Sequence, residues 1–267
     1  MSDQEQLLVI VDPTQDEHPA LERALLTSRI RTEKPKVHIL ICVDPDAVDT
    51  KAENEKVYRP GEWFLDLIKP FQEENLSYQT EFCWSLEWRD AILHTSDRIK
   101  PSLILLPDYP SERKTWFTDA KWMVLRNSEC PVLIVRPNAD AQRKTVLAAI
   151  NTSSDSERYR ELNVAIVVRA AWMAERYGAD LHLVTAYSDS MKYPDKGQLA
   201  RKANVSADHI HVKQGEPVDV IADVAKELDA DVVVIGTMAR QGMLAAMRGN
   251  TSEKLLSRLD MDVMTLN

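Results

Sequence analysis

The sequence lacks long hydrophobic runs and an excess of positive charge, and each absence removes a class of partner. No apolar run approaches the ~20 residues that a helix needs to cross a bilayer, so we expect no membrane span. Lysine and arginine total 33 against 42 acidic residues, and the net charge of −9 argues against nucleic acid or an anionic membrane as main partner. The acidic, polar start MSDQEQ is not typical of a signal peptide.

Cysteine is also scarce, with three residues (Cys42, Cys83 and Cys130) far apart in the sequence. An odd number leaves one cysteine unpaired in any intramolecular disulfide scheme, and the spacing fits no metal site. Buried thiols in a reducing compartment are the simplest interpretation, so we expect a cytoplasmic protein.

The chain that remains has 267 residues, 44% hydrophobic and 28% charged, which is typical of a soluble globular protein with one large or two small domains. Its main feature is an internal repeat. In residues 217–228 apolar side chains recur at the spacing of one helix face, a charged break follows at 229–231, and 232–235 has the composition of a buried parallel strand. Residues 88–106 carry the same helix, break and strand.

Other elements recur in the same order in both halves. Long helices are expected at 19–31 and 156–177, and alternation of strand and helix favours right-handed crossovers and a mostly parallel sheet. The sequence therefore predicts two five-stranded α/β sandwiches that meet near residues 137–143. The remaining expected strands are at 7–11, 37–43, 76–84 and 131–135, and at 146–150, 181–186, 209–213 and 262–266.

One insertion distinguishes the halves. Trp63, Phe64, Leu67 and Ile68 predict an amphipathic helix after the second strand, which we expect to be absent from the shorter connection at 188–205. Tryptophan is concentrated in the same half, where it fills a core or lines a cavity for an apolar ligand. These tryptophans are Trp63, Trp84, Trp88, Trp116 and Trp122.

The order of elements, the duplicated layout and the closing sequence GNTSEKLL resemble tandem universal stress proteins. Residues 118–137, TDAKWMVLRNSECPVLIVRP, resemble the N-terminal half of the bacterial E-type members. The resemblance covers nearly the whole chain. It implies two Rossmann-like domains, 1–138 and 144–267, packed as a pseudo-dimer. It also implies a role in stress survival through binding.

Nucleotide-binding members of this family carry a glycine loop after the fourth strand of a domain. Here Gly236 and Gly249 match the first and third glycines at the family spacing, but Ala239 replaces the second and Asn250 the following Ser or Thr. Backbone N–H groups of such a loop bind phosphate. The expected contacts are Asn151, Gly236, Met238, Arg240, Gly242, Arg248, Gly249, Asn250 and Thr251.

Within that set, Asn151 stands where the family has an acidic residue for the ribose or its metal. An amide hydrogen-bonds a hydroxyl but brings no charge for Mg²⁺, while Arg240 and Arg248 partly compensate by binding phosphate oxygens. The resemblance therefore implies ATP or another adenine nucleotide, with Mg²⁺, as the cofactor. The alternative is structural, because Asn250 followed by Glu253 resembles a capping box that starts a helix.

The N-terminal half keeps the acidic residue, Asp12, but has prolines where the glycine loop should be, at residues 107–111. Gly61 is the one glycine of seven in this half. Because proline removes N–H donors, we expect a degenerate site in the first domain.

Other patterns are weaker. His209 and His211, spaced to share one strand face, suggest a metal pair but lack a third ligand, so no metal site is predicted. Ser153 and Ser154 lie in a turn before a helix, and no catalytic set emerges. We expect at most weak ATP hydrolysis.

The sequence thus predicts a stress-response protein that binds adenine nucleotide in its C-terminal domain. Two alternatives remain open, namely a binder of an apolar or lipid-like ligand and a protein-interaction scaffold with vestigial sites. Protein partners and further dimerisation are compatible with each of these functions.

Overall fold

Runs of Val, Leu and Ile form the central strands of two α/β units. The computed structural model of the chain describes residues 4–43, 59–83, 87–109, 119–154, 156–237 and 251–267. Contacts within the chain divide it into the units Met1–Pro137 and Asn138–Asn267. The domain limits from the sequence and the pseudo-dimeric packing of the two halves stay predictions.

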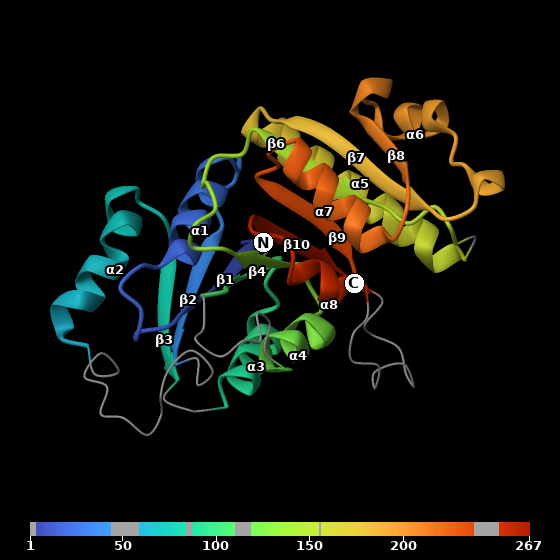
Figure 1. The fold of residues 1–267 in the computed structure, drawn as a ribbon. Coiled ribbons are helices and arrows are strands. Elements are labelled where there is room, and N and C mark those ends of the chain that lie inside the picture. The colour runs from blue at the N-terminus through green and yellow to red at the C-terminus, as the bar shows by residue number, and fades with distance from the viewer. Residues whose placement is uncertain (1–3, 44–58, 84–86, 110–118, 155, 238–250) are drawn as a thin grey trace. The chain divides into compact units, whose positions relative to one another are not determined.

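In the first unit five parallel strands lie in the order β3-β2-β1-β4-β5. Helices α1 and α2 lie on one face, joined by hydrogen bonds from Arg29 to Glu74, and α3 packs against α4 (Figure 1). The strands are β1 (Gln6–Val11), β2 (Lys36–Cys42), β3 (Tyr78–Cys83), β4 (Leu103–Pro107) and β5 (Val132–Val135). The helices are α1 (Pro19–Arg29), α2 (Gly61–Glu73), α3 (Trp88–Ile99) and α4 (Asp119–Asn127).

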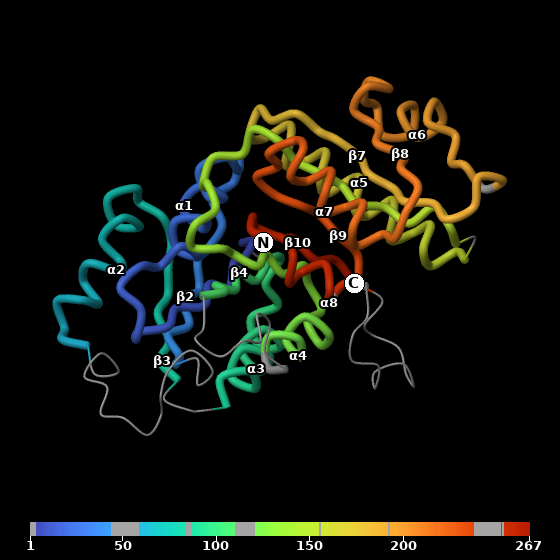
Figure 2. The backbone as a smooth tube through the Cα atoms, viewed as in Figure 1, coloured from blue at the N-terminus to red at the C-terminus, as the bar shows by residue number. Residues whose placement is uncertain are grey.

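The second unit repeats this order as β8-β7-β6-β9-β10, again with parallel pairs, and Figure 2 follows the backbone through both units. The strands are β6 (Thr145–Ala149), β7 (Asp180–Tyr187), β8 (Ile210–Gln214), β9 (Val232–Gly236) and β10 (Asp262–Leu266). The helices are α5 (Glu157–Tyr177), α6 (Lys196–Ala203), α7 (Pro217–Glu227) and α8 (Thr251–Leu256), with short 3₁₀ turns at η2 (Ser190–Lys192) and η3 (Ala207–His209). The predicted α/β class with two tandem, mostly parallel sheets is confirmed.

The core of each unit lies on its inner strands, where side chains on both sheet faces are buried. Leu7, Leu8 and Val9 of β1 have no exposed surface, and neither do Val232 and Val233 of β9. Such strands read as continuous apolar runs because helices cover both faces of a parallel sheet. This is why the sequence predicted these strands to within one or two residues.

The repeat extends to backbone conformation. The breaks predicted after the two matching helices contain Lys100 with φ 48° after α3 and Asp229 with φ 49° after α7. A left-handed residue ends a helix by turning the chain out of the helical path. Both units therefore leave this helix through a left-handed residue three positions before the next strand, Lys100 before Leu103 and Asp229 before Val232.

The connection after the second strand differs from one expectation. The inserted helix of the first unit is present as α2, but the connection at 188–205, expected to lack a helix, contains α6. This helix is polar and short, with Ala200 and Ala203 buried, and hydrophobic periodicity gave no signal for it. Its start is fixed by Asp195, whose side chain accepts the Gln198 N–H at 2.9 Å.

None of the described helices combines the length and the apolarity that a bilayer crossing requires.

Candidate functional site

In each unit the chain changes its direction of winding beside the first strand. β1 pairs with β2 on one side and β4 on the other, and β6 likewise pairs with β7 and β9. Open α/β sheets bind ligands at the carboxyl ends of such strands. We call the end of β1 and β4 the N-terminal switch point, with Asp12 and Asp108, and the end of β6 and β9 the C-terminal switch point, with Asn151 and Thr237.

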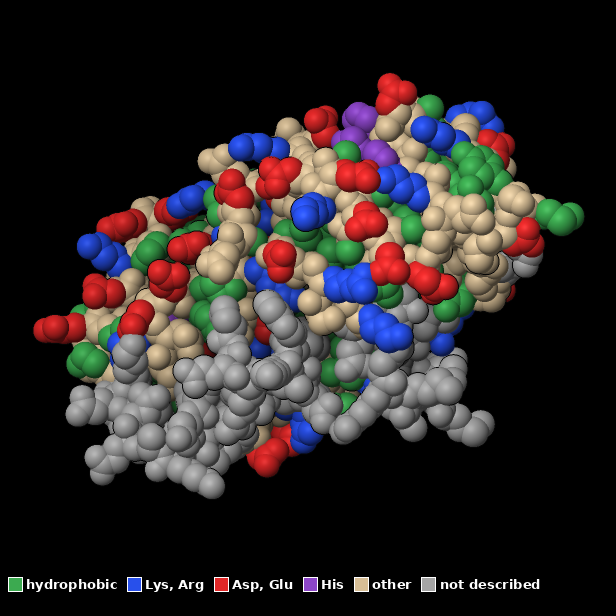
Figure 3. Space-filling view, viewed as in Figure 1, with side chains coloured by type: hydrophobic (Ala, Val, Ile, Leu, Met, Phe, Trp, Pro, Cys, Tyr) green, Lys and Arg blue, Asp and Glu red, His purple; other side chains and the backbone are tan. Residues whose placement is uncertain are grey.

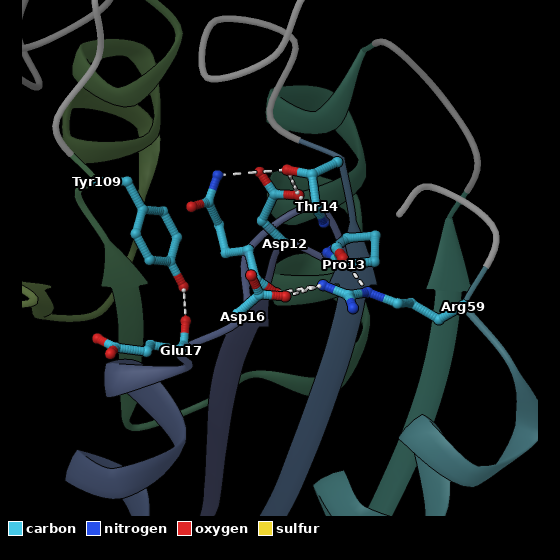
Figure 4. Close-up of polar contacts among 8 residues, drawn as sticks. Asp12, Pro13, Thr14, Asp16, Glu17, Arg59 and Tyr109 are labelled. Atoms are coloured by element: carbon cyan, nitrogen blue, oxygen red, sulfur yellow. Dashed lines mark hydrogen bonds and ion pairs between the residues drawn. The ribbon is translucent and has the colours of Figure 1, made fainter. Parts of the chain in front are cut away.

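At the N-terminal switch point the carboxylate of Asp12 binds its own turn (Figure 4). Its Oδ1 accepts the Thr14 N–H at 2.8 Å and the Thr14 hydroxyl at 2.7 Å, and Asp12 is 2% exposed. The acidic residue that the sequence offered for a ribose or a metal is therefore engaged within the unit.

Two further side chains close over this turn. Arg59 donates to the carbonyl oxygens of Pro13 at 2.7 Å and Gln15 at 2.8 Å, and to the Asp16 carboxylate at 2.9 Å. Tyr109 lies on the other side, where its hydroxyl donates to the Glu17 carbonyl at 2.8 Å (Figure 4). Arg59, which precedes α2, and Tyr109, which follows β4, therefore both hold the segment after β1 by hydrogen bonds.

The residue after β4 is also engaged. Asp108 pairs with Lys121 of α4 at 2.8 Å and with Arg136 after β5, and all three side chains are buried. Buried charges are tolerated when they are paired and hydrogen-bonded. A fixed ion-pair network occupies the place where the glycine loop would start, and the sequence alone did not indicate these partners.

His18, which precedes α1, is a buried titratable group at this end of the unit. Burial lowers its pKa to about 4, with a contribution from the nearby Arg59. Its ring lies edge-on to Trp63, with ring centroids 5.4 Å apart, and both of its nitrogens are buried without a hydrogen-bond partner among the described residues. Burial together with Asp12 and Glu17 raises the pKa of Tyr109. Both rings are therefore neutral around pH 7.

The C-terminal switch point is different. Asn151 is exposed, and Asn163 of α5 fixes its backbone by accepting its N–H at 2.9 Å and donating to its carbonyl at 2.7 Å. Its side-chain oxygen accepts the Ser153 N–H at 2.9 Å. Within the described chain its side-chain N–H₂ group makes no hydrogen bond. Asn151 is thus oriented with a donor left over. Asn163 was missed, because nothing local in the sequence links it to Asn151.

Close packing against α5 explains why residue 236 is a glycine. A Cβ at this position would lie 2.4 Å from Cδ2 of Leu162 and 3.1 Å from Cδ1 of Ile166, both on α5. The glycine therefore lets the long helix lie close against the end of β9, whether or not a ligand binds.

Of the remaining predicted contacts, one lies within the described residues. Thr251 opens α8, and the others lie outside the described residues. These are Met238, Arg240, Gly242, Arg248, Gly249 and Asn250.

The expected pair of histidines belongs to a larger cluster, visible as a purple patch in Figure 3. The ring of His182 in β7 stacks on that of His209, with ring centroids 4.1 Å apart. Its Nδ1 lies 3.1 Å from Nε2 of His211. His209 ends η3 rather than lying on β8, so the two predicted histidines do not share a strand. Burial and the neighbouring histidines lower the pKa of His182 and His211. The part of the chain that is described contains no group of three or more side chains suited to a metal.

The tryptophan-rich region is largely core. Trp88 and Trp122 are buried, whereas Trp63 is half-buried against His18 and Phe64. Trp84 and Trp116 lie outside the described residues.

Comparison with known proteins relates the whole chain to one family. A sequence model of the Universal stress protein family matches residues 194–267. The Universal stress protein E homolog of Haemophilus influenzae is 27% identical over 97% of this chain and 96% of its own. Universal stress protein E of Escherichia coli K12 is 26% identical over 97% and 93%. The chain is thus similar to universal stress proteins over nearly its whole length.

The match to the universal stress protein E relatives covers both units of this chain. The solved structure of a functionally unknown protein from Pseudomonas aeruginosa also matches, with 26% identity and a TM-score of 0.83, over 99% of this chain and 92% of that one. The recognition of an E-type tandem universal stress protein from the sequence is confirmed.

Proposed function

We propose that this universal stress protein acts in the stress response by binding one adenine nucleotide per chain at the C-terminal switch point, without significant turnover. The observation that carries the proposal is the state of Asn151. It is exposed and oriented, with its side-chain N–H₂ group available, whereas Asp12 in the first unit is 2% exposed and bound to its own turn.

The contacts follow from the chemistry of each group. The Asn151 amide donates to a ribose hydroxyl or a phosphate oxygen. In this proposal Gly249 and Asn250 would contribute backbone N–H groups, Thr251 its hydroxyl to phosphate, and Arg240 and Arg248 positive charge. Gly236, Met238 and Gly242 complete the loop. Because the Asn151 amide is a weak ligand for Mg²⁺, this chain would hold the metal mainly by binding the phosphates that carry it.

The N-terminal unit has no part in nucleotide binding in this proposal. Tyr109, Arg59 and the pairs of Asp108 use the donors and acceptors that a nucleotide would need. Its role is structural support of the tandem chain. We place the protein in the cytoplasm, a location supported by Cys42, Cys83 and Cys130 being thiols.

The test is a calorimetric titration of ATP into the ligand-free, full-length chain, with and without Mg²⁺. Gly249→Asp places a carboxylate where phosphate is expected and should abolish binding. Gly61→Asp is the matched control, because a side chain there meets nothing within 4 Å. Unchanged affinity in Gly249→Asp would reject the assigned loop. Absence of binding at millimolar ATP in the wild type would reject the proposal and return attention to apolar ligands and protein partners.

A further inference from the structure

Cys42 and Cys83, which are far apart in the sequence, are neighbours in the first unit. They are the last residues of β2 and β3, and the parallel register pairs them directly. Neighbouring strands lie about 4.8 Å apart, and disulfides span Cα separations of about 4.4 to 6.8 Å. The backbone spacing at this pair is therefore within the range of a disulfide.

The two side chains also share a face of the sheet. His38 Nε2 of β2 lies 2.8 Å from Glu81 Oε2 of β3, so these two side chains are on one face. Side chains an even number of residues apart in a strand share a face. Cys42 follows His38 by four residues and Cys83 follows Glu81 by two, which places both thiols on that same face.

Contacts on the opposite face confirm this assignment. Phe82, which alternates with Glu81 and Cys83, meets Phe64 of α2 with ring centroids 4.9 Å apart. The thiols therefore point away from α2.

The two cysteines differ in exposure. Cys42 is 1% exposed, whereas Cys83 is partly exposed, and both are thiols. We propose that Cys42 and Cys83 form a redox modification site, in which a small peroxide oxidises the pair to an intramolecular disulfide.

The chemistry has two steps. The Cys83 sulfur attacks one peroxide oxygen, the O–O bond breaks, and the departing hydroxide takes up a proton to become water. This leaves a sulfenic acid on Cys83. The Cys42 sulfur then attacks the Cys83 sulfur, the S–O bond breaks, and a second water leaves. The two thiols lose two electrons and two protons, and one hydrogen peroxide is reduced to two waters.

Reduction by a small thiol reverses the change. A disulfide between directly paired strands must draw the two Cβ atoms closer than the sheet holds them, and strained disulfides are the more easily reduced ones. Because both cysteines end their strands, the adjustment affects the last pair of the ladder and leaves the earlier pairs intact. The bond would tie the edge strand β3 to β2.

The direct test uses the reduced full-length protein treated with hydrogen peroxide, then unfolded and alkylated. Titratable thiols should fall from the three in the sequence to one, and dithiothreitol should restore all three. Peptide mapping should find Cys42 joined to Cys83 within one chain, with Cys130 alkylated. Cys130 lies before β5, outside the strands, and is the internal control. A bond to Cys130, a bond between chains, or irreversible oxidation of Cys83 without a link would overturn the proposal.

Two serine variants separate the roles of the thiols. Cys42→Ser removes the second thiol, so Cys83 should accumulate as a sulfenic acid that dimedone traps. Cys83→Ser should leave the buried Cys42 reduced under the same treatment, and Cys130→Ser should behave as the wild type. Equal oxidation of Cys42 in the Cys83→Ser variant would contradict the order of attack. Circular dichroism verifies the fold of each variant, and the wild-type peptide map decides alone if one fails to fold.

Discussion

The two switch points share one strand order but use their polar groups differently. In the N-terminal unit Asp12 binds its own turn, Asp108 pairs with Lys121 and Arg136, and Tyr109 and Arg59 hold the surrounding segments. In the C-terminal unit Asn151 is exposed, with a donor left over. In the proposed function, the N-terminal unit, whose polar groups at the switch point bind one another, supports the fold, and the C-terminal unit, where Asn151 has an available donor, binds the ligand.

The largest expected effect comes from breaking the buried ion pairs of the N-terminal switch point. Asp108→Asn removes the charge that compensates two buried cations, so we expect a loss of about 3–5 kcal/mol in the free energy of unfolding. Urea unfolding followed by tryptophan fluorescence measures it, since five of the six tryptophans lie in the first half. The control is the exposed Asp66→Asn on α2. An effect as small as that of the control would show that the network does not stabilise the unit.

The second effect concerns the close packing of α5 at the C-terminal switch point. Gly236→Ala puts a methyl group 2.4 Å from Cδ2 of Leu162, and overpacking of this kind costs about 1–3 kcal/mol. Gly61→Ala, with nothing within 4 Å, should leave the free energy of unfolding nearly unchanged. Thermal unfolding of both variants makes the comparison. If Gly236→Ala is as stable as the wild type, the packing account of this glycine fails.

The third effect depends on pH and again belongs to the N-terminal switch point. Because folding lowers the pKa of His18 from 6.5 to about 4, the unfolded chain binds its proton more readily. The stability contributed by neutral His18 is complete above pH 6.5 and is lost as the pH falls toward 4. We expect a loss of roughly 2 kcal/mol between pH 7 and pH 5.

His18→Phe keeps the ring against Trp63 but cannot take up a proton. Urea unfolding at a series of pH values should show a flatter profile for this variant than for the wild type. His94→Gln, at an exposed position of α3, should leave the profile unchanged. Identical profiles for the wild type and His18→Phe would mean that His18 is not the titrating group.

The sequence predicts those helices and strands whose pattern of apolar residues lies within a short stretch of the chain. The strand at 262–266 and the helix at 217–227 were predicted because apolar periodicity is a property of neighbouring residues, and duplication supplied each pattern twice. The polar helix α6 was missed because it buries only two alanines among its side chains.

Contacts set by register were beyond the sequence. The pairing of Cys42 with Cys83, of Asp108 with Arg136 and of Asn151 with Asn163 depends on which strands and helices become neighbours. The three cysteines looked isolated because they are far apart along the chain, yet two of them end adjacent strands. The proposed loop was predicted because its glycine spacing is a local signal. The contacts that hold the N-terminal switch point join distant residues, so only the structure revealed them.

In the proposed function only the C-terminal unit holds a nucleotide. ATP titration of ligand-free Asn151→Ala and Asp12→Asn by calorimetry tests this, since each variant alters the residue after the first strand of one unit. We expect one site per chain in the wild type. Affinity should fall about tenfold in Asn151→Ala, which corresponds to one lost hydrogen bond, and stay unchanged in Asp12→Asn. Two sites per chain, or a loss of affinity confined to Asp12→Asn, would contradict the division of work between the two units.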